Sequence, residues 1–162
     1  CRGKIKDAIR VIMNDSEDAL IKFVNDFKEV FMTLSPEEVA FPRSCNNVNK
    51  YIDSNSIYKK GTPIHVKGAL IYNHNINKHR LGMKYPLIRD GDKIKFLMLK
   101  QPNTVKDTVI SFSTKIPYEF ELHKYVDYDT QFQKTFTDPL RFILDSIGWK
   151  LEREATLEAF FG

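Results

Sequence analysis

The stretch LIKFVNDFKEVFMTL, residues 20–34, contains the strongest fold signal in the chain. Its apolar residues recur three and four positions apart, which is the spacing of one face of an α-helix. This stripe runs for about four turns and consists of Leu20, Phe23, Val24, Phe27, Val30, Phe31 and Leu34. Asp15 or Ser16 is expected to cap the helix, with Glu17 and Asp18 beside its positive N-terminal end. We interpret the stripe as core rather than as a partner surface.

Two other segments carry the same helical spacing. In the first, the apolar residues are Ile5, Ala8, Ile9, Ile12 and Met13. In the second, near the other end of the sequence, Asp127 is the predicted N-cap, a break is expected near Pro139, and Gly148 is expected to end the helix. Residues 4–34 and 127–148 are therefore predicted to form a helical base.

Strand signals appear in the middle of the chain. Residues 93–100 and 108–113 are predicted to be strands that pair across the segment between them. Asp90-Gly91-Asp92 before them is a turn signal. Residues 35–42 are predicted to be a turn leading into an extended piece, and residues 43–61 a polar loop with one helical turn inside it.

One further helix is predicted in this middle region, with Thr62 as N-cap, Pro63 as first residue and an end near Asn77. Gly68 inside it costs about 1 kcal/mol relative to Ala, which indicates close approach of another backbone or of a ligand. Together these elements predict an α+β fold, with a mainly helical base and a small β-containing tip.

Positive charge is concentrated in one block of the sequence. The whole chain carries a net charge of +4. Between Arg43 and Lys100, however, twelve basic and three acidic residues give a charge of +9, and the flanking segments together carry −5. Such a block, interleaved with Asn, Tyr and His, favours phosphate binding because each neutralised phosphate releases condensed counterions. The alternative is a solvated lysine-rich face without a partner.

The sequence offers no support for a membrane or secreted protein. No uncharged apolar run approaches the roughly 18–20 residues that span a bilayer, so no membrane partner is expected. The N-terminus, Cys1-Arg2-Gly3-Lys4, lacks the apolar segment of a signal peptide. Cys1 and Cys45 are expected to be free thiols in a reducing cytoplasm. Because the first residue is not Met, we expect a processed product, an internal fragment or a trimmed chain; an excised intein before Cys1 is one further explanation.

Familiar catalytic and metal-binding motifs are missing from the sequence. It contains no Gly-rich phosphate loop, nucleophile elbow, His-Glu-x-x-His or Cys-x-x-Cys. The four histidines have no zinc-type spacing with the cysteines. Asp90 and Asp92 are better explained by a turn than by a two-metal site. We therefore predict no catalytic residue, no metal site and no cofactor in this chain.

The last residues, Glu154 to Phe161, have the spacing of a docking motif. Phe160 and Phe161 follow Leu157 by three and four positions, so one helical turn would present three apolar side chains together. Such plugs bind the apolar pocket of ring-shaped sliding clamps, although Glu154 stands where glutamine is usual. In the alternative interpretation, Phe160 and Phe161 fold back onto their own domain.

Three blocks of the sequence resemble family B DNA polymerases of T-even-type tailed phages. They occur in that family's order and near its spacing: NNVNKY (46–51), PIHVKGALIYN (63–73) and FQKTFTDPL (132–140), the last followed by the C-terminal plug. The resemblance implies that residues 1–151 are the thumb subdomain, with a DNA-facing and tip region at 43–116, and that residues 152–162 bind the clamp. The exonuclease, the fingers and the palm, with its catalytic aspartates and two Mg²⁺ ions, would lie upstream of this chain.

The resemblance also implies which residues contact the primer–template duplex. In the family, the thumb grips this duplex mainly through sugar-phosphate and minor-groove contacts, which position it without reading its sequence. The matching positions here are Ser44, Asn47, Lys50, Tyr51, His65, Lys67 and Lys134. Asp138 falls where the phage relatives carry another lysine, and Lys59 or Lys60 is expected to replace that contact.

The implied function is therefore part of a DNA-directed DNA polymerase, a nucleotidyltransferase of DNA replication, in the cytoplasm of an infected bacterial host. Its partners would be the primer–template duplex, a sliding clamp and the remainder of the polymerase. The chain alone is expected to be inactive.

Two other functions remain open at this stage. The first is a stand-alone nucleic-acid-binding accessory protein, which tight DNA binding by the isolated monomer would favour. An exposed Leu20/Phe27/Phe31 stripe would instead favour the polymerase interpretation, since it would need a partner surface. The second is a metal-dependent nuclease, which the scarcity of carboxylates in the basic block disfavours.

Overall fold

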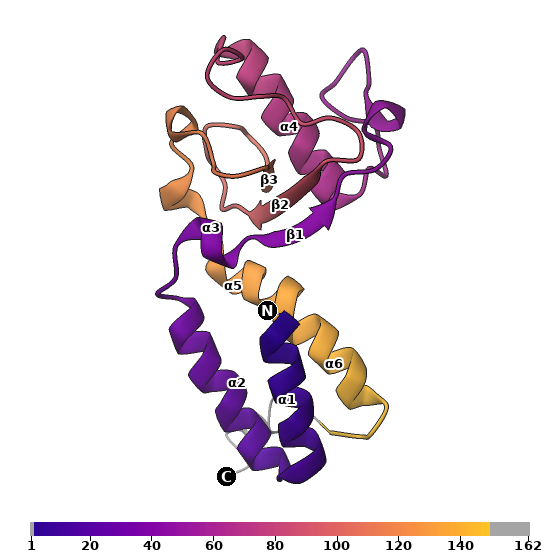
Figure 1. The fold of residues 1–162 in the computed structure, drawn as a ribbon, viewed down its shortest axis with the longest axis vertical. Helices are drawn as coiled ribbons and strands as arrows, with labels where there is room; N and C mark the ends of the chain where they lie inside the picture. The colour runs from indigo at the N-terminus through magenta and orange to yellow at the C-terminus, as the bar shows by residue number, and fades with distance from the viewer. Residues whose placement is uncertain (1, 150–162) are drawn as a thin grey trace. The chain divides into compact units, whose positions relative to one another are not determined.

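The computed structural model describes residues 2–149. The chain forms two compact units (Figure 1). The helical unit combines both ends of the sequence, Cys1–Leu34 and Asp129–Gly162, and the sheet unit is Ser35–Tyr128. The predicted α+β class is confirmed. The predicted clamp-binding residues Leu157, Phe160 and Phe161 lie outside the described residues.

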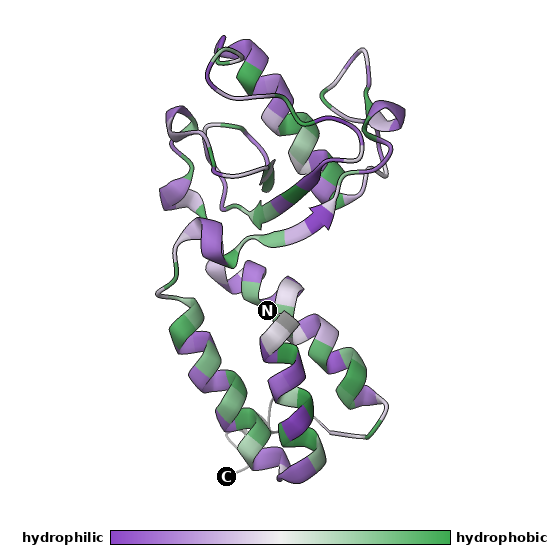
Figure 2. Cartoon of the chain, in the orientation of Figure 1, coloured by the Kyte–Doolittle hydropathy of each residue, from purple (hydrophilic) through white to green (hydrophobic). Residues whose placement is uncertain are grey.

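The helical unit begins with α1 (Arg2–Asn14) and α2 (Glu17–Phe31). Ser16 caps α2, since its side-chain oxygen accepts a hydrogen bond from the Ala19 N–H at 3.2 Å. Four members of the predicted stripe, Leu20, Val24, Phe27 and Phe31, are buried. Val30 is 55% exposed and lies off the buried face. Figure 2 shows apolar and polar residues alternating along α2, as expected for a helix with one buried face.

Four phenylalanine rings form the centre of this unit. Phe27 and Phe31 come from α2, and Phe132 and Phe136 come from the other end of the sequence. The centroid of the Phe27 ring lies 4.8 Å from that of Phe136 and 5.6 Å from that of Phe132, within the range of favourable aromatic pairs. This cluster therefore joins two segments that are separated by the whole sheet unit in sequence.

The C-terminal helical segment is continuous, so the predicted break near Pro139 is wrong. α5 (Tyr128–Phe132) runs into a π-helical turn, η4 (Gln133–Thr137), and then into α6 (Asp138–Asp145). Pro139 stands at the start of α6, where its missing N–H costs little. Within this π-helical segment the Thr135 and Thr137 hydroxyls donate to carbonyls four residues earlier, at 2.7 and 3.1 Å. The helical segment begins at Tyr128, directly after Asp127, which is the position predicted for its N-cap.

The end of α6 confirms the predicted role of Gly148. Its φ is +76°, in the left-handed region that favours glycine. The Trp149 N–H donates to the Leu144 carbonyl at 3.1 Å, which is the 6→1 bond of a Schellman motif.

The sheet unit contains a three-stranded antiparallel sheet with the order β1-β2-β3. Its strands are β1 (Phe41–Ser44), β2 (Lys93–Met98) and β3 (Val109–Phe112). The predicted pairing of the last two strands is confirmed, with Leu97 opposite Ile110. β1 occupies the end of the predicted extended piece and the start of the predicted loop, and Phe41 pairs with Phe96. The first two residues of the segment predicted as loop, Arg43 and Ser44, are therefore strand.

Short helical elements complete the sheet unit around one long helix, α4 (Ile64–Lys78). Before the sheet lies α3 (Pro36–Val39), capped by Ser35, whose hydroxyl accepts from the Glu38 N–H at 3.3 Å. The 3-10 turns are η1 (Val48–Tyr51), η2 (Tyr118–Phe120) and η3 (His123–Tyr125). No helix among residues 2–149 combines the length and apolarity needed to cross a membrane.

α4 packs directly on β3 at Gly68. A Cβ added there would lie 2.8 Å from the Ser111 backbone nitrogen and closer still to the Ser111 hydroxyl oxygen. That hydroxyl is fully buried and donates to the His65 carbonyl at 2.8 Å. The close approach predicted at Gly68 is therefore to a strand backbone. The predicted Thr62 cap is wrong by one residue: Pro63 precedes the helix without a side-chain cap bond, and the Thr62 hydroxyl donates to the Lys59 carbonyl.

Candidate nucleic-acid interface

A loop that contains three of the predicted DNA contacts is fixed by the turn at residues 90–92. The Cys45 N–H donates to the Asp92 carbonyl at 2.8 Å, and the Gly91 N–H donates to the Cys45 carbonyl at 2.7 Å. The Val48 N–H donates to Asp90 Oδ1 at 2.9 Å. These bonds hold Asn47 with a φ of +64°, in the left-handed region, and start the η1 turn that contains Lys50 and Tyr51.

The turn itself has the predicted geometry. Gly91 has a φ of +84°, and Asp92 Oδ2 accepts from the Arg89 N–H at 2.8 Å. Both carboxylates therefore serve as backbone acceptors. Among residues 2–149, no group of three or more His, Cys, Asp or Glu side chains is arranged to hold a metal ion.

Cys45 lies beneath this loop and is fully buried. Burial, and then the negative charges of Asp90 and Asp92, raise its pKa to about 11. Cys45 is therefore a protonated thiol at neutral pH, which is the state of an unreactive structural cysteine.

Ser44 and His65 lie together at the junction of β1 and α4. Ser44 pairs with Lys93 in the sheet, and a hydrogen bond links the Ser44 backbone to the His65 side chain. Burial and the nearby Arg43 charge lower the pKa of His65, and the bond to Ser44 opposes this only in part. His65 is therefore a neutral imidazole at pH 7, able to form a hydrogen bond but not an ion pair with phosphate.

Lys67 is held inside a polar cluster. Its ammonium nitrogen lies 3.3 Å from Asp107 Oδ1 and 4.9 Å from the centroid of the Tyr58 ring. The Tyr58 hydroxyl donates to Asp107 Oδ2 at 2.7 Å. Burial lowers the pKa of Lys67, but contact with Tyr58 and the charge of Asp107 outweigh it and raise that pKa. Lys67 is thus charged, and Asp107 balances that charge.

Lys59 and Lys60 are exposed and lie in the loop that follows Tyr51. The Lys59 N–H donates to the Tyr51 carbonyl at 2.9 Å, which closes the loop beside η1. Lys50 is also exposed, with its ammonium 5.4 Å from the centroid of the Tyr51 ring. Three exposed lysines therefore belong to one continuous segment, residues 50–60.

Lys134 is the one predicted contact that belongs to the helical unit, where it lies exposed on η4. The other eight predicted positions all lie in the sheet unit. Within that unit the structure joins Ser44 to His65 and Lys59 to Tyr51, whereas Lys67 is occupied by Asp107.

Two exposed basic residues of the sheet were not predicted as contacts. Arg43 on β1 stands opposite Ile94, and Lys93 on β2 stands opposite Ser44. Both side chains are exposed, and Arg43 lies near the His65 ring. Both residues were counted in the basic block, but β1 was not recognised as a strand. Recognising Phe41–Ser44 as a strand would have placed Lys93 opposite the predicted contact Ser44, with Arg43 beside it.

A groove of about 590 Å³ lies beside η1 and the residue that follows it, Ile52. Its walls come from η1, from α4 and from the segment that follows α4. Asn73 in this wall donates its amide N–H to the Ile88 carbonyl at 2.9 Å and accepts from the Ile88 N–H at 2.8 Å. None of the nine predicted contacts lines the groove.

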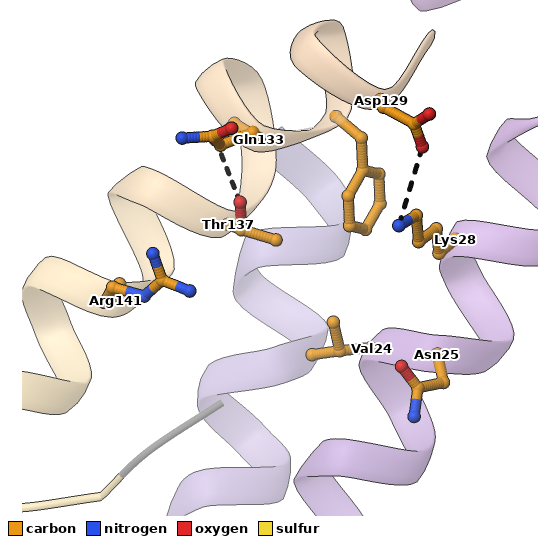
Figure 3. A pocket seen from close by; sticks show the side chains of 8 residues that line it. Val24, Asn25, Lys28, Asp129, Gln133, Thr137 and Arg141 are labelled. Carbon is orange, nitrogen blue, oxygen red and sulfur yellow. Dashed lines mark hydrogen bonds and ion pairs between the residues drawn. The ribbon is translucent and has the colours of Figure 1, made fainter. Parts of the chain in front are cut away.

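The helical unit contains a second pocket, of about 450 Å³, between α2 and the C-terminal helical segment (Figure 3). An ion pair of 3.6 Å joins Lys28 on α2 to Asp129 on α5 at one side of it. Figure 3 places Arg141 on α6 and Val24 on α2 farther along the pocket. Among the described residues that line this pocket, none is a nucleophile with an adjacent general base.

Comparison with known proteins supports the resemblance seen in the sequence. No family model matches the chain. It is 28% identical over 162 residues to the DNA-directed DNA polymerase of Enterobacteria phage T4, covering 98% of this chain and 18% of that protein. It is 27% identical to the DNA-directed DNA polymerase of Escherichia phage RB69, covering 97% of this chain and 17% of that protein.

The chain therefore spans less than a fifth of the length of these two polymerases, but almost all of it matches them. The resemblance to phage DNA polymerases that was predicted from three short blocks is confirmed over nearly the whole chain.

Proposed function

We propose that this chain is the thumb portion of a phage DNA-directed DNA polymerase, and that it holds the primer–template duplex through sequence-independent backbone contacts. The observation that carries the proposal is the similarity to two phage polymerases over 97–98% of the chain. In this proposal the catalytic aspartates and the two Mg²⁺ ions belong to the palm of the same polymerase, outside this chain.

The distribution of charge between the two units supports the proposal. Fifteen basic and nine acidic residues give the sheet unit a charge of +6, whereas the rest of the chain carries −2. The exposed lysines of residues 50–60 supply local positive charge, and Ser44, Asn47 and Tyr51 supply neutral hydrogen-bonding groups. Contacts of this kind position a duplex without reading its bases.

The salt dependence of duplex binding tests these contacts. We expect Lys50→Ala and Lys134→Ala each to lower the slope of log K against log salt by about 0.9, because each removes one neutralised phosphate. Lys124→Ala is the matched control: Lys124 is exposed in the sheet unit, like Lys50, but lies outside the basic block and the predicted contacts. Wild-type slopes for both test variants would overturn these two assignments.

We also propose that the segment 152–162 tethers the polymerase to a sliding clamp through Leu157, Phe160 and Phe161. In the complete polymerase, deleting residues 157–162 is expected to abolish clamp-stimulated synthesis and to leave distributive synthesis intact. Equal loss of both activities would show that the segment is structural.

The burial of the α2 stripe keeps one alternative open. Leu20 and Phe31 are at most 1% exposed and Phe27 is 8% exposed, so the exposed stripe that would have favoured the polymerase interpretation is not present. A self-contained helical unit is also compatible with a stand-alone nucleic-acid-binding accessory protein. Weak binding by the isolated chain, restored in the complete polymerase, is expected from the proposal; tight binding by the isolated monomer would support the alternative.

A further inference from the structure

We infer that Tyr58 is a positioning residue, which holds the loop of residues 51–62 so that Lys59 and Lys60 face the duplex phosphates. The inference rests on the proposed function, because it concerns the same interface. It replaces the direct DNA contact predicted for Lys67 with a role in positioning this loop.

The Tyr58 side chain is fixed at its edge and at its face. Its hydroxyl donates to Asp107 Oδ2 at 2.7 Å, and the Lys67 ammonium lies 4.9 Å from the ring centroid. Asp107 is itself fixed, because its Oδ1 accepts from the Thr108 N–H at 2.7 Å and pairs with Lys67 at 3.3 Å. The side chains of Lys67 and Asp107 are only 25% and 16% exposed, so solvent screens their ion pair less than a surface pair.

This cluster is the side-chain anchor of the loop. The other bonds that shape it are local: the Lys59 N–H donates to the Tyr51 carbonyl at 2.9 Å, and the Ser56 hydroxyl donates to the Tyr58 carbonyl at 2.7 Å. Tyr58 ties the loop to α4 through Lys67 and to the residues before β3 through Asp107. The loop's other described hydrogen bonds join residues 51–62 to one another.

The two lysines follow the anchor directly in sequence. Lys59 and Lys60 are exposed, and Gly61 turns the chain back with a φ of +84°. A lysine contributes to phosphate binding in proportion to the time that its ammonium spends near the phosphate. Fixing the backbone beside it removes part of the entropy that binding would otherwise cost.

The balanced charge of Lys67 fits this role better than direct contact. Its ammonium already has Asp107 as counter-ion. Removing the Lys67 side chain would therefore leave the negative charge of the Asp107 carboxylate unbalanced. We therefore assign the cluster to loop position, and the released counterions to Lys59 and Lys60.

Duplex binding as a function of salt tests the inference. We expect Lys59→Ala/Lys60→Ala to lower the slope of log K against log salt by about 1.8, since two phosphates are lost. Tyr58→Ala is expected to lower the slope toward the same value, and Tyr58→Phe, which keeps the ring over Lys67, by a smaller amount. In the Lys59→Ala/Lys60→Ala background neither Tyr58 substitution should change the slope further.

Tyr118→Phe is the matched control, because Tyr118 lies in the same unit and is 80% exposed; its slope should equal that of wild type. Circular dichroism and a thermal melt check each variant for folding, and Tyr58→Phe keeps the test available if Tyr58→Ala does not fold.

A wild-type slope for both Tyr58 variants, or a Tyr58 effect that persists without the two lysines, would overturn the inference. If Lys50→Ala lowers the slope but the double lysine variant does not, the inference fails and the proposed function stands; wild-type slopes for all lysine variants would overturn both.

Discussion

The helical unit and the sheet unit are stabilised in different ways. The helical unit is centred on four phenylalanine rings and its backbone bonds are mostly local to its helices. In the sheet unit, irregular segments are fixed by side chains that bond to distant backbone, such as Asn73 to Ile88 and Asp90 to Val48. Apolar packing supplies stability over a broad area, whereas such single polar bonds fix the position of particular loops. The proposed DNA contacts lie mostly in the second kind of environment.

The largest expected effect tests the aromatic centre of the helical unit. Phe136 is fully buried, and its ring centroid lies 5.1 Å from that of Phe132. Phe136→Ala is expected to lower the free energy of unfolding by about 3–5 kcal/mol, because it removes apolar contacts and leaves a cavity. Urea denaturation measures the loss. Phe142→Ala in α6, where the ring is 83% exposed, is the control and should cost less than about 0.5 kcal/mol.

The next effect tests the packing of the sheet unit. Gly68→Ala is expected to cost about 2–3 kcal/mol, because the new Cβ meets the backbone of Ser111 and the helix must move away from the strand. Gly82→Ala has open space around its Cβ and serves as the control. Tryptophan fluorescence of Trp149 in the helical unit, followed beside far-UV circular dichroism, shows whether both units unfold together. Equal stabilities for the two glycine variants would contradict the described contact.

A smaller effect depends on pH and on Cys45. The folded structure raises the pKa of Cys45 from 9.0 to about 11, so folding favours the protonated thiol. This contribution is fully present below about pH 9 and is lost as the pH rises to about 11, with a total of about 3 kcal/mol. Between pH 8.5 and 10.5, the free energy of unfolding should therefore fall by about 2 kcal/mol more for wild type than for Cys45→Ala. Parallel curves would show that the thiol ionises equally in both states.

The smallest effect tests the start of α2. Ser16→Ala removes the side-chain acceptor of the Ala19 N–H and is expected to cost about 1 kcal/mol. Ser146→Ala is a matched control in the same unit, because the Ser146 hydroxyl donates to a carbonyl at the end of α6 and caps no free N–H. Chemical denaturation of both variants measures the change in the free energy of unfolding. An equal change for the two variants would show that the Ser16 side chain does not stabilise α2 as a cap.

The elements that local patterns describe were predictable from the sequence. α2 follows from its stripe, Gly148 from the need for a left-handed residue after a helix, and the turn at Asp90 to Asp92 from its residue types. The strands β2 and β3 followed from two apolar runs on either side of a polar segment. In each case residues close in sequence carry the cause.

The failures have two causes: pairing with a distant segment, and local hydroxyl bonds that residue type alone does not reveal. β1 has only four residues and includes a proline, so its identity depends on pairing with β2 about 50 residues later. The π-helical turn around Thr135 was not predictable, because the spacing of apolar residues does not distinguish one π-helical turn from an α-helical one. In the structure, the Thr135 hydroxyl donates to the Gln131 carbonyl within this turn. Thr62 has the residue type of a cap, but its hydroxyl bonds to Lys59 instead.

The candidate site shows the same division. The resemblance located the segment that contains Lys50, Lys59 and Lys60, and all three are exposed. It could not show that Asp107, 40 residues after Lys67, balances the charge of that lysine. Nor could it show that Arg43 lowers the pKa of His65, because that effect requires β1 to lie beside the start of α4.

The double bond between Asn73 and Ile88 has a consequence for sequence variation. The Asn73 amide contacts only the N–H and carbonyl of residue 88, groups that every amino acid except proline provides. Neighbouring Leu87 and Arg89 can therefore be exchanged for other residues without loss of this attachment. A single asparagine on α4 thus fixes the backbone path here and places no demand on the side chains that follow it.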